Sequence, residues 1–387
     1  MTPLSSVPEA ADVAVLGGGL AGLAVAAMLA EEDASVVLLE RSPEGSLGFS
    51  ARTHGAVGLG YADHPIRLVR SLGETVAREL VRCSADNLTL LRTRGWLNGE
   101  GMLTASLGET ERDEIAESIQ FLEQWGLPVE ACSKARVADH LGDSALGPGW
   151  WDARCGWLDP ASTVARAEEW ARSAGASVVH GATVSHTRDG VPETVVCGTH
   201  AGAAFELKAD VVVHAAGLSE RSLDPFFADK LFPVRFQMQR LALPDRRAVP
   251  PPFCAQLSYL QCAPRADGTV VLGGCRWATP HLEAGEEDPF TLSEAVDQKL
   301  TAVRTGLLQA RMGDADVVER TAGIMTFTCD GLPIVGPLPG RVGHIACLGW
   351  NGRPWSHALR AATAIRDGLM TGHSDGWPTL LTPQRFV

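Results

Sequence analysis

The most informative pattern in the chain is Asp12-Val-Ala-Val-Leu-Gly-Gly-Gly-Leu-Ala-Gly22, close to the N-terminus. The four residues that follow Asp12 are apolar and partly β-branched, which predicts a short buried strand. The glycines that follow fit the pattern G-x-G-x-x-G, and the run of Ala, Leu, Val and Met over residues 20–31 predicts a helix. A second apolar strand is expected over residues 35–39, followed by Glu40. This order predicts a βαβ unit that binds a dinucleotide.

Each part of the motif has a physical role in holding such a ligand. Gly17 permits the tight turn, Gly19 lacks the Cβ atom that would block a pyrophosphate, and Gly22 lets the helix lie close to the strand. The helix N-terminus offers N–H groups and a positive dipole end to the phosphates. Glu40 falls 18 residues after Gly22, where a carboxylate accepts hydrogen bonds from ribose hydroxyls. The motif alone fits FAD and NAD equally and argues against a 2′-phosphate.

The composition indicates a soluble globular protein large enough for two domains. The chain has 387 residues, of which 45% are hydrophobic and 20% charged. A net charge of −13 without a basic stripe argues against a nucleic-acid partner. The first apolar stretch, residues 13–30, is interrupted by glycines, so we expect neither a signal peptide nor a membrane span. Nine dispersed cysteines without metal-binding spacing predict buried thiols, a cytoplasmic location and no metal site.

Later segments predict the rest of the architecture. Apolar strands are expected over residues 176–180 and 209–214, and the second runs into Ala215-Ala216-Gly217, small residues that allow a close approach to a cofactor. The charged stretch 109–117 is expected to be a solvated helix face. The other expected elements are helices over residues 161–174 and 291–312, strands over residues 234–243, 255–261 and 269–277, and a hairpin turn at Ala266-Asp267-Gly268.

These features together resemble the D-amino-acid oxidase superfamily of FAD-dependent oxidoreductases, which includes glycine oxidase, sarcosine oxidase, dimethylglycine dehydrogenase and γ-glutamylputrescine oxidase. The resemblance is carried by the strand–GGG–helix start and by Ala209-Asp-Val-Val-Val-His-Ala-Ala-Gly217. It is most specific in the C-terminal block Thr321-Ala-Gly-Ile-Met-Thr-Phe-Thr-Cys-Asp-Gly-Leu-Pro-Ile-Val-Gly-Pro337. This block is similar to the family's T-x-D-x-x-P-x-x-G segment, where the chain turns back to the flavin.

The resemblance implies an α/β fold with an FAD-binding, doubly wound Rossmann-like domain and a second, mixed-sheet α+β substrate domain. The first is expected over residues 1–84, 150–231 and 320–387, and the second over residues 85–149 and 232–319. The cofactor-binding residues implied are Gly17, Gly19, Leu20, Ala21, Gly22, Glu40, Arg41, Arg52, Thr53, His54, Ala216, Gly217, Gly349, Asn351, Gly352, Arg353 and Pro354.

The last turn of the predicted domain also fits this resemblance. Residues 344–348 are expected to form a strand, and Gly349-Trp-Asn-Gly-Arg353 the turn that opens a helix reaching about residue 369. Pro354 suits the first helical position because its missing N–H is not needed there. In the family the positive end of this helix faces the pyrimidine edge of the flavin. The alternative is an ordinary capped C-terminal helix.

Two positions bear on substrate and on flavin attachment. Glycine oxidase and its nearest relatives have an Arg, which pairs with the substrate carboxylate, close to the position of Met325 in this chain. Gly323 falls near the flavin-linking Cys of sarcosine oxidase, so that linkage is not expected here. His54 matches the His that is bonded to flavin in dimethylglycine dehydrogenase. We expect noncovalent FAD, with covalent attachment through His54 as the alternative.

The expected reaction is oxidation of a C–N bond in an amine or amino-acid-derived substrate by hydride transfer to flavin N5. The partners are a small-molecule amine and oxygen or another electron acceptor, with no nucleic acid and no membrane; the oligomeric state is left open. Candidate substrate contacts are Tyr259, Arg276 and Arg353, while Arg235 is expected to be structural. One alternative is oxidation of a C–OH bond, as in 2-hydroxyacids, with a base drawn from His54, His64, His281 and His357. The other is a flavin-binding protein without redox turnover.

Overall fold

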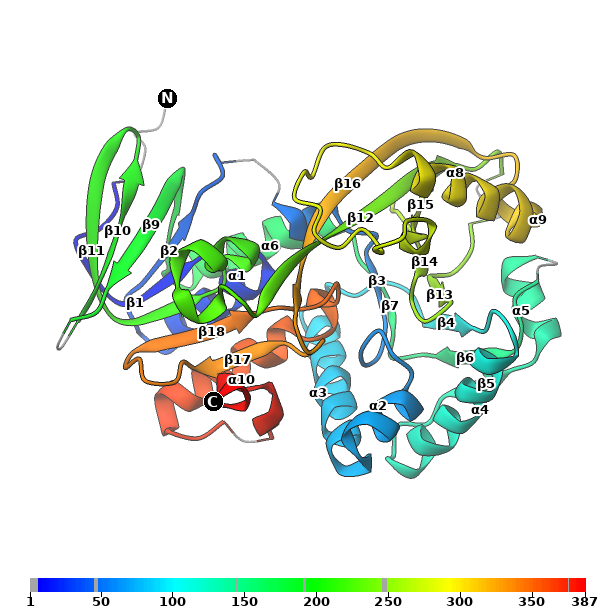
Figure 1. Ribbon diagram of the computed structural model, residues 1–387, viewed down its shortest axis with the longest axis horizontal. Helices are drawn as coiled ribbons and strands as arrows, with labels where there is room; N and C mark the ends of the chain where they lie inside the picture. The colour runs from blue at the N-terminus through cyan, green and yellow to red at the C-terminus, as the bar shows by residue number, and fades with distance from the viewer. Residues whose placement is uncertain (1–5, 45–47, 143–144, 191–192, 246–248, 375) are drawn as a thin grey trace. The chain divides into compact units, whose positions relative to one another are not determined.

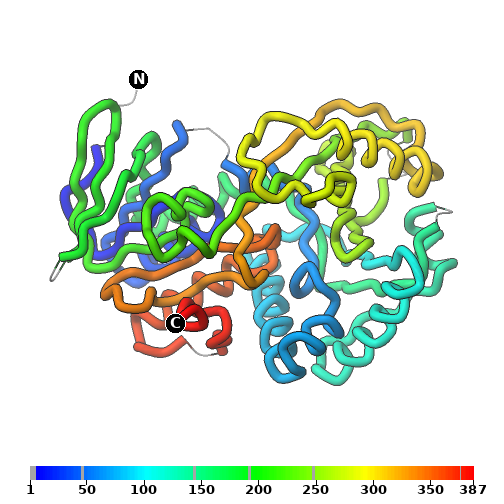
Figure 2. The backbone as a smooth tube through the Cα atoms, viewed as in Figure 1, coloured from blue at the N-terminus to red at the C-terminus, as the bar shows by residue number. Residues whose placement is uncertain are grey.

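A computed structural model describes residues 6–44, 48–142, 145–190, 193–245, 249–374 and 376–387. The chain forms two compact units. Unit 1 comprises residues 1–51, 161–233 and 325–387, and unit 2 comprises residues 52–160 and 234–324. The chain therefore passes between the units after residues 51, 160, 233 and 324 (Figure 2). Residues 52–84 and 150–160, which the sequence assigned to the cofactor domain, pack within unit 2.

Unit 1 is built on a largely parallel sheet with the strand order β17-β18-β11-β1-β2-β8. Figure 1 labels these strands apart from β8. Neighbouring strands from β18 to β8 are parallel, whereas β17 is antiparallel to β18. Strands β9 and β10 extend β11 as an antiparallel addition. The bounds are β1 Ala10–Leu16, β2 Val36–Glu40, β8 Ser177–His180, β9 Ala182–Arg188, β10 Thr194–His200, β11 Ala203–His214, β17 Ile334–Pro337 and β18 His344–Leu348.

The helices of unit 1 follow the predicted sequence pattern. All eleven residues of α1 are buried, as its Ala- and Leu-rich composition requires, and α1 packs against α10. The predicted C-terminal helix begins later than expected, because Pro354 starts a 3₁₀ turn, Pro354–Ser356, that precedes α10. The bounds are α1 Leu20–Ala30, α6 Pro160–Ser173, α7 Glu220–Leu223 and α10 Ala358–Thr371.

Unit 2 contains most of a mixed sheet with the order β16-β12-β15-β14-β13-β4-β6-β5, and a small β3-β7 pair. The bounds are β3 Ala56–Val57, β4 Met102–Ala105, β5 Glu130–Cys132, β6 Gly149–Asp152, β7 Gly156–Trp157, β12 Leu231–Ala242, β13 Phe253–Ala255, β14 Leu260–Pro264, β15 Val270–Gly274 and β16 Asp316–Thr328. The helices are α2 Pro65–Leu72, α3 Glu74–Thr93, α4 Glu109–Gln124, α5 Lys134–Leu141, α8 Glu294–Ala302 and α9 Gln309–Met312.

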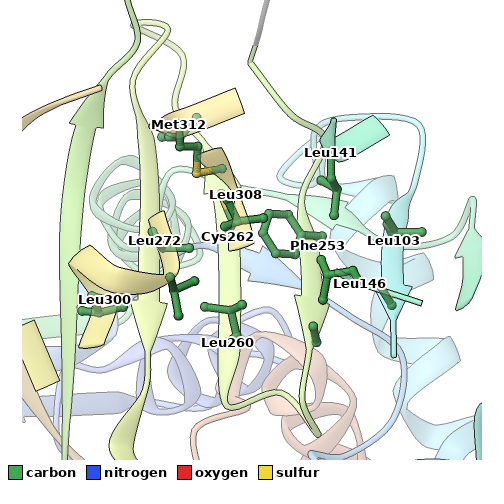
Figure 3. Packing of buried hydrophobic residues seen from close by; sticks show 14 of the residues in the cluster. Leu103, Leu141, Leu146, Phe253, Leu260, Cys262, Leu272, Leu300, Leu308 and Met312 are labelled. Carbon is green, nitrogen blue, oxygen red and sulfur yellow. The ribbon is translucent and has the colours of Figure 1, made fainter. Parts of the chain in front are cut away.

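The core of unit 2 lies between its sheet and helices α5, α8 and α9. Leu260, Cys262 and Leu272 project from β14 and β15 toward Leu300 and Leu308, and Phe253 fills the space beside them (Figure 3). All of these side chains are buried. Burying a side chain of this size contributes about 1.5–3 kcal/mol, so this cluster fixes the hairpins of the sheet.

The structure confirms the α/β fold class and corrects two further local predictions. The strand expected over residues 255–261 is interrupted, because Gln256, Leu257 and Ser258 all have left-handed φ angles of 52–62°. The helix face expected to be solvated in α4 is partly buried, since Glu111 and Glu114 are each only 6% exposed. In the described part of the chain, no helix is both long and apolar enough to cross a membrane.

Candidate functional site

The glycine turn between β1 and α1 has the close packing that the motif requires. Gly17 has a φ of +103°, and a Cβ atom there would lie 2.7 Å from the carbonyl oxygen of Ala215. A Cβ atom on Gly22 would lie 2.0 Å from the carbonyl oxygen of Gly17, so the helix can approach the strand only with glycine at this position. The turn is therefore held between α1 and the segment that follows β11.

The second glycine of the motif faces open space on its ligand side. A Cβ atom on Gly19 would meet one neighbour within 4 Å among the described residues, the hydroxyl of Ser50 at 3.2 Å. The same Ser50 Oγ lies 3.5 Å from the backbone nitrogen of Leu20, the first residue of α1. Ser50 therefore borders the helix N-terminus where an anion would bind. The sequence motif gave no sign of it, because Ser50 lies 30 residues beyond Leu20.

Glu40 at the end of β2 ties the glycine turn to the sheet. One carboxylate oxygen accepts the backbone N–H of Gly18 at 2.7 Å, and the other accepts that of Ser42 at 2.7 Å. A carboxylate has about four lone-pair sites, so both bonds leave acceptor capacity for hydroxyl groups. Arg41 beside it is exposed, whereas Leu20 and Ala21 are buried in α1.

The side chain of Asn351 holds the C-terminal turn of unit 1 through hydrogen bonds. Asn351 has a φ of 49°; its Oδ1 accepts the backbone N–H of Thr328 at 2.9 Å, and its Nδ2 donates to the carbonyl oxygen of Gly349 at 2.8 Å. Gly349 and Gly352 also have positive φ angles, of 78° and 83°. Met325 is buried and packs under this turn, because a Cβ atom on Gly352 would lie 3.0 Å from its sulfur. The side chain of Asn351 therefore shapes the turn before Pro354.

Three predicted cofactor residues, Arg52, Thr53 and His54, belong to unit 2. His54 is buried, and its Nδ1 accepts the backbone N–H of Ala56 at 2.9 Å. The proton of a neutral imidazole is therefore on Nε2. Arg265 holds this segment by donating to the carbonyl oxygens of His54 at 2.7 Å and Thr53 at 2.9 Å.

Tyr259 and Arg276 come together at one end of the β14–β15 hairpin. The guanidinium carbon of Arg276 lies 5.0 Å from the centroid of the Tyr259 ring, a cation–π distance. Arg276 also donates to the carbonyl oxygen of Leu282 at 2.8 Å. Burial lowers the pKa of Arg276, although Tyr259 and Glu283 oppose the shift. An arginine remains charged after such a shift, so this end of the hairpin carries a half-buried positive group.

The left-handed turn before Tyr259 is anchored by Glu111 on α4. Glu111 Oε1 accepts the backbone N–H of Leu257 at 2.7 Å, and Oε2 accepts that of Leu107 at 2.7 Å. His64 Nε2 lies 3.1 Å from Oε1. Burial alone would raise the pKa of Glu111, but the bonds from His64 and from these two N–H groups lower it below its ordinary value. The buried carboxylate thus fixes the loop that carries Tyr259.

The remaining candidates of the sequence occupy different environments. Arg235 is buried and paired with Glu283 at 2.6 Å, so it has a structural partner as expected. His281 is exposed, whereas His357 is buried at the N-cap of α10. Of the candidate bases, His54, His64 and His281 belong to unit 2 and His357 to unit 1.

A buried histidine pair lies on the neighbouring strands β11 and β18 of unit 1. His214 Nε2 and His344 Nδ1 are 2.9 Å apart, and Asp224 completes a set that could reach a metal ion. Asp224, however, pairs with the guanidinium of Arg341. Two imidazoles that bind one metal tetrahedrally at 2.0–2.1 Å have nitrogens about 3.3 Å apart. The short separation and the cation therefore favour a hydrogen bond over a shared metal.

The geometry of unit 1 fits a dinucleotide cofactor. The glycine turn has no room for a Cβ atom at Gly17 or Gly22, while the helix N-terminus beside Gly19 is bordered by a hydroxyl. Backbone N–H groups, a nearby hydroxyl and an acidic residue at the next strand end form a donor set suited to a pyrophosphate and a ribose.

Comparisons with known proteins agree with this reading. Residues 12–367 match the family model described as FAD dependent oxidoreductase. A curated relative from Pseudomonas aeruginosa, the tRNA 5-methylaminomethyl-2-thiouridine biosynthesis bifunctional protein MnmC, is 29% identical over 84% of this chain and 48% of its own length. The probable oxidoreductase OrdL from Haemophilus influenzae is 27% identical over 41% of this chain and 38% of its own length. The chain thus spans about half or less of these relatives.

Solved structures share the whole fold. Glycine oxidase from Geobacillus kaustophilus superimposes with a TM-score of 0.80, at 21% identity, over 98% of this chain and all of its own. L-proline dehydrogenase from P. horikoshii superimposes with a TM-score of 0.83, at 16% identity, over 98% of each chain. At such identities the likeness shows the fold alone.

Proposed function

Because the chain belongs to the FAD-dependent oxidoreductase family, we propose that it oxidises a C–N bond of an amine or an amino-acid-derived substrate. Unit 1 would hold FAD through the glycine turn, Ser50 and Glu40, with FAD bound noncovalently. FAD, when bound, supplies the two-electron acceptor that no side chain can provide. The role of the protein is to bind and orient the amine in its neutral form, so that the carbon beside nitrogen can lose its hydrogen and the C–N bond become an imine.

The observation that supports the amine assignment is a buried hydrogen-bond acceptor in unit 2 that has no donor among the described residues. Gln256 Oε1 is shielded from solvent, and none of the described residues donates a hydrogen bond to it. An unsatisfied buried acceptor costs about 1–3 kcal/mol. A donor group on a bound substrate, such as the N–H of an amine, would satisfy it. Gln256 lies in the left-handed turn that leads to Tyr259, so the acceptor and the aromatic ring belong to one loop.

Residues 322–326 and Arg276 bear on the class of substrate that the protein accepts. Residues 322–326, where related enzymes for free amino acids have an Arg, read Ala-Gly-Ile-Met-Thr and offer no charge to a carboxylate. A buried carboxylate left without a partner costs about 3–5 kcal/mol, as when one member of a buried ion pair is removed. Amines whose carboxylate is masked or distant are therefore the preferred substrates in this proposal. Arg276 offers the alternative, a carboxylate contact from the hairpin.

Anaerobic stopped-flow measurement of flavin reduction tests the proposal, with an amino acid beside its amide and with primary and secondary amines. We expect the amide or a larger amine to react faster than the free acid. Gln256→Leu should raise the amine concentration for half-maximal reduction about tenfold, the equivalent of one hydrogen bond. Gln298→Leu, at an exposed position on α8, is the matched control. An unchanged response in Gln256→Leu would overturn the role of the buried acceptor.

A second comparison isolates Arg276. Arg276→Gln should leave the reaction with the amide nearly unchanged, and Arg320→Gln, on the exposed edge strand β16, serves as the control. A strong preference for the free acid in the unmodified protein, lost in Arg276→Gln, would contradict the masked-carboxylate proposal. It would assign carboxylate binding to the hairpin.

A further inference from the structure

A series of polar contacts around the buried histidine pair runs from the partly exposed Arg341 to the Ala215–Gly217 segment of unit 1. The backbone N–H of Ala216 donates to Glu220 Oε1 at 3.0 Å, and Glu220 Oε2 lies 2.8 Å from His214 Nδ1. His214 Nε2 lies 2.9 Å from His344 Nδ1. His344 Nε2 in turn lies 3.1 Å from Arg341 Nη2. All the side chains from Glu220 to His344 are at most 1% exposed.

The Glu220 carboxylate and the Arg341 guanidinium, at the two ends of this series, set the direction of the hydrogen bonds between them. A carboxylate can only accept and a guanidinium can only donate. His214 must therefore donate from Nδ1 to Glu220 and accept at Nε2. His344 must then donate from Nδ1 and accept at Nε2 from Arg341. In this arrangement each ring donates from Nδ1 and accepts at Nε2.

The groups that face His344 agree with a neutral ring. Burial first, and then the charge of Arg341, lower the pKa of His344 to about 4. Arg341 is itself held by Asp224 and by the exposed Asp189. Asp189 Oδ1 lies 3.1 Å from His344 Nε2, and the hydroxyl of Thr194 lies 3.3 Å from it. Nε2 of His344 would donate to Asp189 only after the ring had taken up a second proton, well below neutral pH.

The Glu220 end of this series contacts Ala216, which packs against the glycine turn. Ala216 follows β11, and a Cβ atom on Gly17 would lie 2.7 Å from the Cα atom of Ala216. The backbone N–H of Ala215 donates to the carbonyl oxygen of Leu16 at 2.9 Å. A shift of Ala216 would therefore move the wall against which the first glycine of the motif packs.

We infer that Glu220, His214, His344 and Arg341 form a directed hydrogen-bond relay that positions the Ala215–Gly217 segment for FAD binding. These are positioning residues, and the inference rests on the proposed cofactor. The sequence predicts small residues at this segment, but no local pattern reveals the relay, because His214 and His344 lie 130 residues apart.

Two substitutions of His344 separate the relay from simple packing. Glutamine carries a donor and an acceptor on one amide, so His344→Gln can still donate to His214 and accept from Arg341. His344→Leu has a similar bulk and can do neither. Glu220→Gln is an independent test, because an amide oxygen cannot replace both carboxylate oxygens as acceptors. His186→Leu, at an exposed position on β9 in the same unit, is the matched control.

Hydrogen exchange of the peptide that contains Ala216, followed by mass spectrometry on the holoenzyme, is the primary readout. We expect at least tenfold faster exchange in His344→Leu and Glu220→Gln, with His344→Gln and His186→Leu close to the unmodified protein. FAD retained after dialysis should follow the same order. Unchanged exchange in both disruptive variants, or equal effects of Gln and Leu at position 344, would overturn the relay. An unmodified protein without FAD would contradict the proposed function instead, and the exchange comparison would still judge the relay.

Discussion

Single glycines and one carboxylate carry the cofactor assignment at the scale of the residue. Gly17 and Gly22 have no room for a side chain, whereas Gly19 faces open space except for Ser50. Gly19→Val would place a branched side chain where a pyrophosphate must approach the helix N-terminus. We expect the purified variant to have lost bound FAD while its circular dichroism spectrum stays native.

The control for this prediction is Gly306→Val, at a position in unit 2 where a Cβ atom meets nothing within 4 Å. FAD content is measured as the ratio of flavin to protein absorbance. Stoichiometric FAD in Gly19→Val would show that the phosphates bind elsewhere.

Glu40 has a second role that its sequence position does not reveal. It was expected to bind ribose hydroxyls, and the structure adds its bonds to the backbone N–H groups of Gly18 and Ser42. Glu40→Gln keeps the size of the side chain but gives it one acceptor oxygen. Hydrogen bonds to a charged group contribute about 1.5–3 kcal/mol, so FAD affinity should fall by tenfold or more. Equal dissociation constants in a fluorescence titration of the two apoproteins would refute this role.

The main departure from expectation at the scale of the element is the loop between β13 and β14. Three consecutive non-glycine residues in left-handed conformation are costly, and Glu111 holds them through the N–H of Leu257. Glu111→Gln should lower the free energy of unfolding by about 1–3 kcal/mol at pH 7. It should also weaken substrate binding, because Tyr259 follows the loop. Urea unfolding curves and the substrate dependence of flavin reduction measure the two effects.

The lowered pKa of Glu111 determines how the loss of stability in Glu111→Gln depends on pH. A carboxyl group whose pKa is depressed in the folded state contributes stability above its unfolded value, and that stability is lost as pH falls through the folded pKa. The ordinary value for Glu111 is 4.5. The difference in stability between the unmodified protein and Glu111→Gln should therefore be full above pH 5 and shrink below pH 4.5. A difference that does not change with pH would contradict the role of the charge.

The sequence was sufficient for those parts of the molecule whose contacts are local. The β1–α1–β2 unit follows from hydrophobic periodicity and the glycine pattern, and β18 has the bounds that were expected, residues 344–348. Contacts between distant segments could not be read in this way. Glu111 and Leu257 are 146 residues apart, so α4 looked like a solvated face. Ser50, the left-handed turn and the histidine relay were missed for the same reason.

For the whole molecule, we propose that this member of the FAD-dependent oxidoreductase family oxidises amines. The absorption spectrum of the purified protein, recorded anaerobically before and after addition of an amine and again after acid precipitation, tests it most directly. We predict the bands of oxidised flavin, their bleaching by amines and not by 2-hydroxyacids, and a coloured supernatant with a colourless pellet. A coloured pellet would show covalent flavin, with His54 as the residue to replace. A protein without flavin bands, or with bands bleached by 2-hydroxyacids alone, would contradict the account.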